Sequence, residues 1–361
     1  MDIADITKIK QAKMIRKSTI NLKFANIGKL KKLKEIAIEY VRVSNIFIDQ
    51  LWEQKQFCGR FVKDTSVESW ISARLKAAAA KQALDIVKSQ RKKKKKIKPT
   101  LKQMVLNLSS NFIVIKQDIN SFDIWLRLTS IGNKIMINLP SQRHIHFNRL
   151  VSNGWKIKKS IRLRINENGY FIDVFFEKEA PILKTIGKSK AIDIGYKKLI
   201  VSSDGEFIGN NLIYEKIACK KQGSKSFKRA LIERNELINI SCKMLKLNNV
   251  KELFAEDLKS VKHKSKGKIY KEFNNKLQRW AYPKVLEKLT MLCEEVGILF
   301  KKIPPQYTSQ RCSICGVICK SNRSGEIYKC TCGNIMDSDE NAAHNILFMG
   351  QYGAHALQPN L

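Results

Sequence analysis

The spacing of apolar positions divides the first part of the chain into one extended and two helical stretches. Residues 15–24 alternate with a period of two, which predicts a strand with basic residues between the apolar ones. Apolar positions recur every three or four residues between Gly28 and Leu51 and again between about Thr65 and Lys88, which predicts two helices. Small residues on the second helix predict close packing: Ala73, Ala77, Ala78, Ala80 and Ala83.

Short alternating segments follow Pro99 and predict a β-rich region. These segments lie at 112–119, 124–128, 134–139, 161–165 and 170–177, with turn residues at 132–133 and 166–169. The two predicted helices therefore form an insert between one early strand and the rest of a β module.

A change of composition at 181–190 predicts a domain boundary. The elements expected beyond it are a hairpin arm over 190–203 with its turn at Asp204-Gly205, a helical region over 216–246, a strand over 250–255, a helix over 272–296 and a last helix from about Asp339. This second part has the mixed pattern of an α/β domain.

The charge balance narrows the class of partner. The chain has 361 residues, and 68 Lys and Arg against 32 Asp and Glu give a formal net charge of +36. A chain this basic predicts a polyanionic partner, and nucleic acid is the first candidate. Lysines interrupt every apolar run before about eighteen residues, which excludes a membrane-spanning helix. Residues 1–13 contain no secretory signal pattern.

Three acids lie at the ends of predicted elements. Asp193 follows the apolar residues of AIDIG, Glu256 closes the strand of ELFAEDL, and Asp339 opens the last helix. Ala343 and Ile346 share the helix face of Asp339, so this face can pack against a sheet. Carboxylates in this arrangement can hold two Mg²⁺ or Mn²⁺ ions for phosphodiester hydrolysis. The alternative interpretation is solvated strand ends and a helix cap.

Nine cysteines are distributed unevenly. Five crowd into 312–332, and the other four are scattered: Cys58, Cys219, Cys242 and Cys293. The distribution favours a reducing cytosol and one metal site over a disulfide framework. The pairs Cys312-x₂-Cys315 and Cys330-x-Cys332 predict one structural Zn²⁺, because four thiolates leave no position for water. The alternatives are a merely buried cysteine cluster, or Cys319 as a substitute ligand.

The segments AIDIG, AEDL, TSQRCSICG, KCTCG and DSDENAAHNI resemble the RuvC motifs and zinc module of the transposon-encoded TnpB nucleases, whose C-terminal half the compact type V CRISPR effectors share. The resemblance runs from end to end but is specific only over 303–346. It implies an α/β fold with an N-terminal wedge-like β-barrel carrying a helical insert, and a C-terminal RNase H-like RuvC domain with an inserted zinc-binding module. The second cysteine pair departs from the family, which usually has two intervening residues.

The resemblance also implies a division of the chain. The expected parts are the first barrel strand (1–27), the helical recognition insert (28–103), the rest of the barrel (104–183), the nuclease domain with its first two motifs (184–305), the zinc module (306–335), the third motif (336–350) and the tail (351–361).

By the same resemblance, Asp193, Glu256 and Asp339 match the catalytic metal-binding acids. The nearby Asp204 is then a turn residue, and Asp257 and Asp337 are local helpers, with Asp337 the nearest rival of Asp339.

The implied function is RNA-guided, metal-dependent DNA cleavage by one RuvC-like site of a mobile element. The implied partners are a guide RNA from the transposon end and a double-stranded DNA target, with one monomer on each RNA, in the bacterial or archaeal cytosol. The alternatives are a nuclease-inactive RNA-guided repressor and an unguided RuvC-like nuclease or transposase accessory protein.

Basic and aromatic residues outside these motifs supply further candidates. A nucleic-acid backbone contact is expected at the basic run and at one later arginine: Arg91, Lys92, Lys93, Lys94, Lys95, Lys96 and Arg279. The alternative for the run is a solvated loop. Trp280 can stack on a base or pack in the core. His144 and His146, on a predicted strand without an acid or cysteine nearby, are not expected to bind metal.

Overall fold

The computed structural model describes residues 13–54, 66–110, 112–119, 121–130, 135–258, 275 and 277–353. Two compact units, 1–179 and 180–361, divide the chain. Several sequence predictions lie outside the described residues: the terminal segments 1–12 and 354–361, Cys58, the turn at 132–133 and the first residues of the helix predicted over 272–296.

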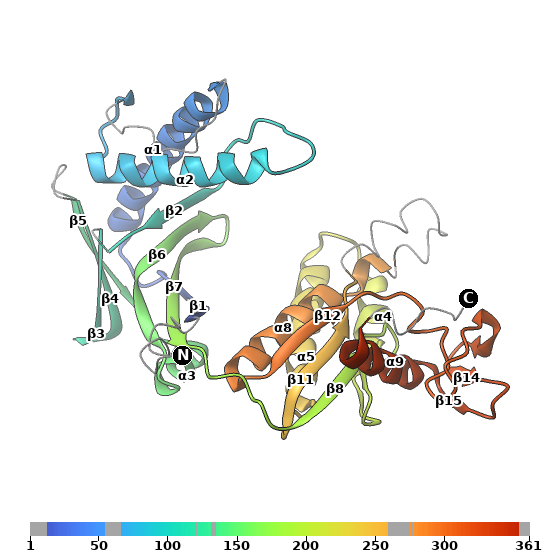
Figure 1. Cartoon of the computed structure of the whole chain (residues 1–361). Coiled ribbons are helices and arrows are strands. Elements are labelled where there is room, and N and C mark those ends of the chain that lie inside the picture. The colour runs from blue at the N-terminus through green and yellow to red at the C-terminus, as the bar shows by residue number, and fades with distance from the viewer. Residues whose placement is uncertain are drawn as a thin grey trace, which may run out of the picture. The chain divides into compact units, whose positions relative to one another are not determined.

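The first unit contains two antiparallel sheets (Figure 1). One consists, in spatial order, of β1 (Lys13–Asn21), β7 (Gly169–Glu179), β6 (Lys156–Asn166) and β2 (Met104–Leu108). The other consists of β3 (Ile113–Ile119), β4 (Phe122–Ser130) and β5 (Ile135–Ser141). Strand β1 pairs with β7 along its whole length, so the first strand joins the end of the β module. Among the described strands the hydrogen bonds form two separate sheets, and closure into one barrel stays a prediction.

Helices α1 (Ile27–Glu53) and α2 (Ala73–Arg91) lie between β1 and β2 in the sequence and pack against each other. A buried hydrogen-bond chain joins them to the sheet. The hydroxyl of Tyr40 donates to Gln82 Oε1 at 3.1 Å, and the Gln82 amide donates to the carbonyl of Val105 at 2.8 Å. The alanines that α2 buries are Ala79, Ala80 and Ala83, whereas Ala77 and Ala78 are half-buried and Ala73 is exposed.

Two local predictions for this unit are wrong, and one strand was not predicted. Helix α2 begins at Ala73 instead of Thr65, because Ser72 caps it by accepting a hydrogen bond from the Leu75 amide. Strand β2 was not predicted, because its five residues show too short a pattern. His144 and His146 belong to the start of helix α3 (Ile145–Ser152) and not to a strand. Both rings face backbone oxygens of β1.

The second unit is built on one mixed sheet. Its strands, in spatial order, are β10 (Phe207–Ile208), β9 (Ile200–Ser202), β8 (Lys188–Asp193), β11 (Val250–Glu256) and β12 (Leu299–Ile303). Strands β8, β9 and β10 are antiparallel neighbours, and the β9–β10 turn lies at Asp204-Gly205 as predicted. Strands β8, β11 and β12 are parallel. Strand β12 was not predicted, because Lys301 and Lys302 interrupt its short apolar pattern.

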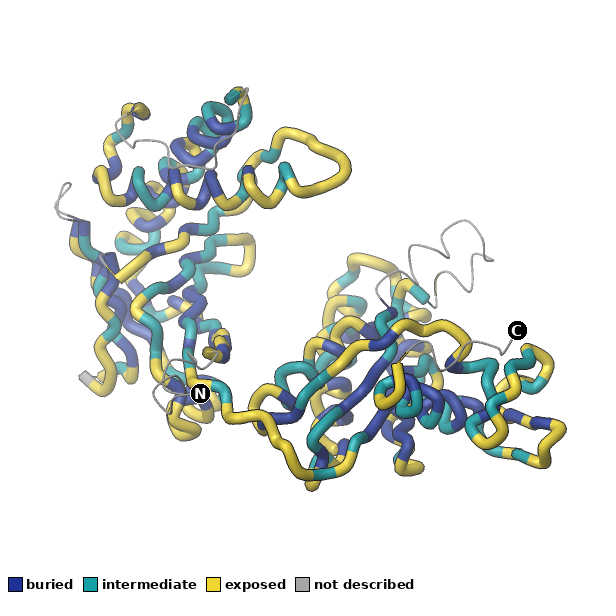
Figure 2. The backbone as a smooth tube through the Cα atoms, in the orientation of Figure 1, coloured by how far each residue is buried: buried dark blue, intermediate teal, exposed yellow. Residues whose placement is uncertain are grey.

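Helices cover both faces of this sheet. They are α4 (Leu212–Ala218), α5 (Lys225–Met244), α8 (Tyr282–Val296) and α9 (Ser338–Tyr352). Ile192 and Leu253 face the core shared with α4, α5 and α8, whereas their neighbours Ala191 and Phe254 face α9. Because helices cover both faces, β8 and β11 are among the most buried strands of the sheet, as Figure 2 shows.

Two helix boundaries differ from the sequence prediction in this unit. The helical region expected over 216–246 is two helices, because Gly223 has a positive φ of 83° and Ser224 caps α5. Helix α8 begins at Tyr282, with a proline in its first turn. None of the described helices is both long and apolar enough to cross a bilayer.

Candidate active site and cysteine centre

Two of the predicted acids end neighbouring strands. Asp193 is the last residue of β8 and Glu256 is the last residue of β11. These strands are parallel, and Ile192 pairs with Ala255, so each acid is the next residue along its strand. The carboxyl ends of parallel strands meet at one sheet edge, which places the two carboxylates side by side.

The third predicted acid, Asp339, lies in the first turn of α9. This helix packs on the sheet so closely that a Cβ on Gly350 would lie 2.4 Å from the Phe254 ring. Near the start of the helix, a Cβ on Gly195 would lie 3.7 Å from Asp339 Oδ2. Gly195 follows Asp193 by two residues, so the helix brings Asp339 to the same sheet edge.

Burial raises the pKa of all three acids, and repulsion by the other two adds to the effect at Asp193. Burial raises the pKa of Asp193 well above its usual range, and the charges of Glu256 and Asp339 raise it further. Burial also raises the pKa of Glu256, against a hydrogen bond from Thr308, and the pKa of Asp339, against the positive charge of Arg323. A multivalent cation bound between these acids would stabilise their ionised form, because its positive charge offsets both burial and repulsion.

The rival acids have structural partners. Asp337 is the N-cap of α9: its Oδ1 accepts hydrogen bonds from the amides of Asp339 at 3.0 Å and Glu340 at 3.2 Å. Its other oxygen pairs with Lys198. Asp204 lies in the β9–β10 turn and pairs with Lys188 at 2.6 Å. Asp337 therefore organises the helix start that carries Asp339.

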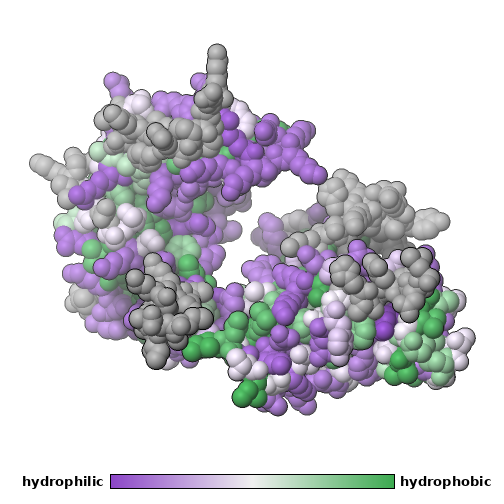
Figure 3. Space-filling view, in the orientation of Figure 1, coloured by the Kyte–Doolittle hydropathy of each residue, from purple (hydrophilic) through white to green (hydrophobic). Residues whose placement is uncertain are grey.

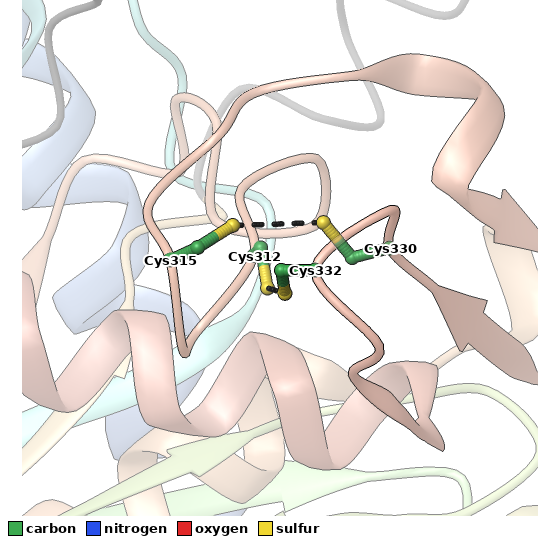
Figure 4. Close-up of side chains that lie close together, drawn as sticks. All are labelled: Cys312, Cys315, Cys330 and Cys332. Atoms are coloured by element: carbon green, nitrogen blue, oxygen red, sulfur yellow. Dashed lines mark hydrogen bonds between the residues drawn. The ribbon is translucent and has the colours of Figure 1, made fainter.

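The four predicted cysteines come together, and their sulfur atoms all lie within 4.8 Å of one another. Figure 4 shows the thiols converging from two turns, with Cys312 and Cys332 Sγ atoms 3.7 Å apart and those of Cys315 and Cys330 3.6 Å apart. The shortened second pair therefore does reach the cluster. Cys319 takes no part in it, and its thiol lies 3.0 Å from the Ser321 hydroxyl.

The surroundings of Cys312 favour a thiolate. Burial opposes ionisation of this thiol, but backbone amides and the Asn334 side chain outweigh it and lower the pKa of Cys312 to about 6. The three-stranded sheet of β13 (Arg323–Ser324), β14 (Ile327–Lys329) and β15 (Ile335–Asp337) lies next to this centre. Tyr328 of β14 is fully buried with Cys312 and Cys330.

Two asparagines that the sequence interpretation missed fasten the cysteine segment to α9. Asn345 donates to the carbonyls of Thr308 at 2.9 Å and Arg311 at 2.7 Å. Asn341 donates to Arg311 at 2.8 Å and accepts from the Ser313 amide at 2.9 Å. Their spacing of four residues on a face of small apolar side chains was a usable signal, because buried amides need partners.

Two more missed side chains reach the acids directly. The Thr308 hydroxyl donates to Glu256 Oε1. The Arg323 guanidinium donates to Asp339 Oδ1 at 3.0 Å. Thr308 precedes the first cysteine pair and Arg323 lies between the two pairs, but nothing in a local pattern indicates which acid each one contacts. The cysteine centre and the acids are thus two parts of one hydrogen-bonded assembly.

The predicted basic residues differ in their surroundings. Arg91, the last residue of α2, donates to the carbonyl of Trp52 at 2.9 Å and lies over that ring, so it joins the ends of α1 and α2. Lys92–Lys96 form an exposed loop, which Figure 2 shows as a continuous exposed tube and Figure 3 as a hydrophilic surface. Arg279 is half-buried. Trp280 packs against the core and donates to the Gly195 carbonyl at 2.9 Å, which favours the packing interpretation.

Comparisons with known proteins agree with these motifs. The family model described as Cas12f1-like, TNB domain matches residues 282–346. A CRISPR-associated endodeoxyribonuclease Cas12f1 of Sulfoacidibacillus thermotolerans is 51% identical over 72 residues, which cover 19% of this chain and 17% of that protein. A TnpB-like protein of Acanthamoeba polyphaga mimivirus is 32% identical over 95 residues, which cover 26% of this chain and 18% of that protein.

The fold is similar to that of a solved relative. The cryo-EM structure of a Cas12f1–sgRNA–target DNA complex superposes with a TM-score of 0.58 at 15% identity, over 89% of this chain and 83% of that chain. This likeness concerns the fold, whereas the sequence matches span less than a fifth of each relative's own length. Residues 282–346 therefore match a Cas12f1-like module, and over part of its sequence the chain is similar to Cas12f1 and to TnpB-like proteins.

Proposed function

We propose that the chain is an RNA-guided DNA endonuclease that hydrolyses phosphodiester bonds at a single RuvC-like site. The observation that carries this proposal is the convergence of Asp193, Glu256 and Asp339 from β8, β11 and α9 at one sheet edge. Asp337 caps a helix and Asp204 pairs with a lysine, so these two acids have other roles.

The proposed architecture follows from this site. The mixed sheet with its helices is the RNase H-like RuvC domain (184–305 and 336–350), interrupted by the zinc module (306–335). The two sheets of the first unit are the wedge-like module (1–27 and 104–183), and α1 and α2 belong to the recognition insert (28–103). The fold shared with the Cas12f1 structure supports this division.

The acids fit divalent cations. Carboxylates are hard oxygen donors, and two Mg²⁺ or Mn²⁺ ions held by them would supply an activated water and stabilise the leaving oxygen. Asp193, Glu256 and Asp339 would bind these ions, and Thr308 would orient the Glu256 carboxylate. The chain supplies no covalent nucleophile in this proposal.

The cysteine centre fits one Zn²⁺. Four sulfur donors within 4.8 Å match the preference of zinc for tetrahedral thiolate sites. All four positions are protein thiols, so the zinc role is structural. The module would hold Thr308 and Arg323 in place beside the acids.

The proposed partners are a guide RNA from the transposon end and double-stranded target DNA, bound by one monomer per RNA. The Cas12f1 relative of known structure was solved as a complex with sgRNA and target DNA. The net charge of +36 requires a polyanion of this kind for neutralisation.

One experiment separates this proposal from its alternatives. The full chain is expressed together with its flanking DNA, the co-purified RNA is sequenced, and cleavage of a randomised duplex DNA library is measured with Mg²⁺. We expect a discrete RNA and cleavage that follows its sequence. Cleavage without a discrete RNA would indicate an unguided nuclease, and a discrete RNA with sequence-specific DNA binding but no cleavage would indicate a repressor.

A further inference from the structure

A cation from the cysteine module lies against the acid site. Arg323 begins β13, and its guanidinium is paired with Asp339 Oδ1 at 3.0 Å. The Asp339 side chain is 15% exposed and that of Arg323 is 36% exposed. The ion pair is therefore partly shielded from solvent, where it is screened less than a surface pair.

The backbone of Arg323 is held by the cysteine centre. Arg323 pairs with Tyr328 across the β13–β14 hairpin, and Tyr328 is buried against Cys312 and Cys330. The Tyr328 hydroxyl also donates to the carbonyl of Gln310 at 3.2 Å. The position of the guanidinium thus depends on the folded cysteine module.

The other end of the hairpin is held by the loop that follows β8. Glu326, in the hairpin turn, pairs with Lys197 and, at 3.8 Å, with Lys198. Both lysines lie in the loop that follows Asp193. The hairpin is therefore fixed at its two ends over the acid site, and Arg323 is placed between these attachments.

The charge of Arg323 acts on all three acids. It lowers the pKa of Asp193, Glu256 and Asp339 and so offsets part of the rise that burial causes. Lys198 also faces this edge, but its own hydrogen bond goes to Asp337. The positive charge of Arg323 thus acts on all three carboxylates, and its guanidinium donates to one oxygen of Asp339.

We propose that Arg323 is an internal counter-ion of the acid site that competes with divalent cations for Asp339. This inference rests on the proposed function of the acids. A guanidinium donor occupies a carboxylate oxygen that a cation would need, and its positive charge repels the cation. Arg323 is therefore a positioning residue through which the cysteine module sets the divalent-ion affinity of the nuclease site. By linkage, divalent-ion binding weakens the Arg323–Asp339 contact to the same extent.

The test is a Mn²⁺ titration of the zinc-loaded full chain at low salt and pH 8.5, with electron paramagnetic resonance as the measure of bound Mn²⁺. We expect Arg323→Gln to bind Mn²⁺ roughly five- to tenfold more tightly than the wild type, because one repelling charge is removed. Arg323→Lys retains the charge and should bind within about twofold of the wild type. Added salt should shrink the difference between wild type and Arg323→Gln.

Lys329→Gln is the matched control. It removes the same charge from the same hairpin, but its exposed side chain lies on the face opposite to that of Tyr328 and Arg323. Its Mn²⁺ affinity should equal that of the wild type. Zinc content and thermal melting confirm the fold of each variant, and Arg323→Met serves as a second charge-free variant if Arg323→Gln loses zinc.

The outcomes separate this inference from the proposed function. Unchanged or weaker Mn²⁺ binding in folded Arg323→Gln and Arg323→Met overturns the counter-ion role, as does tighter binding by Lys329→Gln to the same degree. Failure of Asp193→Asn to reduce Mn²⁺ binding overturns the proposed metal site itself, whatever Arg323 does.

Discussion

The hydroxyl of Thr308 donates a hydrogen bond to the carboxylate of Glu256, so the segment that leads into the first cysteine pair is tied to the end of β11. Thr308 is 1% exposed, and its backbone carbonyl accepts a hydrogen bond from the side-chain amide of Asn345. The cysteine segment, strand β11 and helix α9 therefore meet at one threonine. A side chain in this position orients Glu256 without being a metal ligand itself.

Thr308→Val should lower nuclease activity by roughly ten- to a hundredfold, because outer contacts of metal-binding residues have effects of this size. Loss of the hydrogen bond should also raise the pKa of Glu256 further, so the acid limb of the pH–rate profile should move to higher pH. The measurement is cleavage of target DNA between pH 5.5 and 8.5. Thr308→Ser keeps the hydroxyl and should retain the wild-type profile, and an equal loss in both variants would argue against the orienting role.

Asp193→Asn, Glu256→Gln and Asp339→Asn should each abolish Mg²⁺-dependent cleavage and leave nucleic-acid binding largely intact. Each substitution removes a charged oxygen donor and keeps the side-chain shape. The control is Asp337→Asn, because asparagine also caps helices and should preserve the start of α9. Cleavage is measured on radiolabelled duplex with guide RNA. Wild-type rates in any of the three acid variants would remove that residue from the site.

The purified protein should contain one zinc ion per chain. Cys312→Ser and Cys330→Ser should lower both zinc content and stability, because binding of a structural metal contributes directly to folding. Cys319→Ser is the matched control, since its thiol lies outside the cluster. Elemental analysis and thermal melting give the two readouts. Active wild-type protein without zinc would reduce the four cysteines to a packed cluster.

A buried ion pair predicts how the first unit responds to acid. Burial alone would raise the pKa of Asp173, but hydrogen bonds from Arg164, at 2.7 and 2.9 Å, and from Thr19 outweigh burial and lower it. The stabilisation is therefore complete above the unfolded pKa of about 3.9 and is lost as pH falls through the lower folded value. Asp173→Asn should cost about 2 kcal/mol at pH 7 and much less at pH 2.5.

Urea denaturation of wild type and Asp173→Asn at the two pH values measures this effect. Glu177→Gln is the control, because Glu177 pairs with Lys13 and Lys158 at the surface, where ion pairs contribute little. An equal stability difference at both pH values would show that the Asp173 side chain acts through packing and not through its charge.

The pattern of the sequence predicted the strands that carry Asp193 and Glu256, because a buried strand that ends in an acid is a local signal. It did not predict that β8 and β11 are neighbours, since strand order depends on helices that lie between them in sequence. Short elements such as β2, β12 and α3 were missed for a related reason. Each is stabilised by its partners more than by its own periodicity.

The cysteine spacing predicted its own cluster, but not the side chains that connect it to the acids. Thr308 and Arg323 acquire their partners only when the module folds onto the sheet, so no local pattern identifies them. The basic run contains a difference that no local pattern indicates either. A basic run predicted one role for all six residues, whereas the first is held by backbone carbonyls of α1 and the remaining five are exposed.

The exposed lysines Lys92–Lys96 give the last prediction, that this loop contacts a nucleic-acid backbone. Each phosphate contact releases condensed counterions and contributes about 0.9 to the slope of log K against log salt for duplex DNA, or about 0.7 for single strands. If three of the five lysines contact phosphate, replacing all five with glutamine should flatten the slope by roughly two to three. Affinity should fall alike for all sequences, because backbone contacts carry no base information.

The measurement is the affinity of wild type and variant for guide RNA and for target DNA at several salt concentrations. Arg91 stays unchanged in this variant, because its guanidinium holds the ends of α1 and α2 together. A five-lysine-to-arginine variant of Lys92–Lys96 keeps the charge and should keep the slope. A solvated loop would supply only a long-range attraction, which salt screens beyond about 10 Å. Loss of direct phosphate contacts must change the number of released ions and therefore the slope. Unchanged slopes for both nucleic acids in the glutamine variant would identify Lys92–Lys96 as a solvated loop.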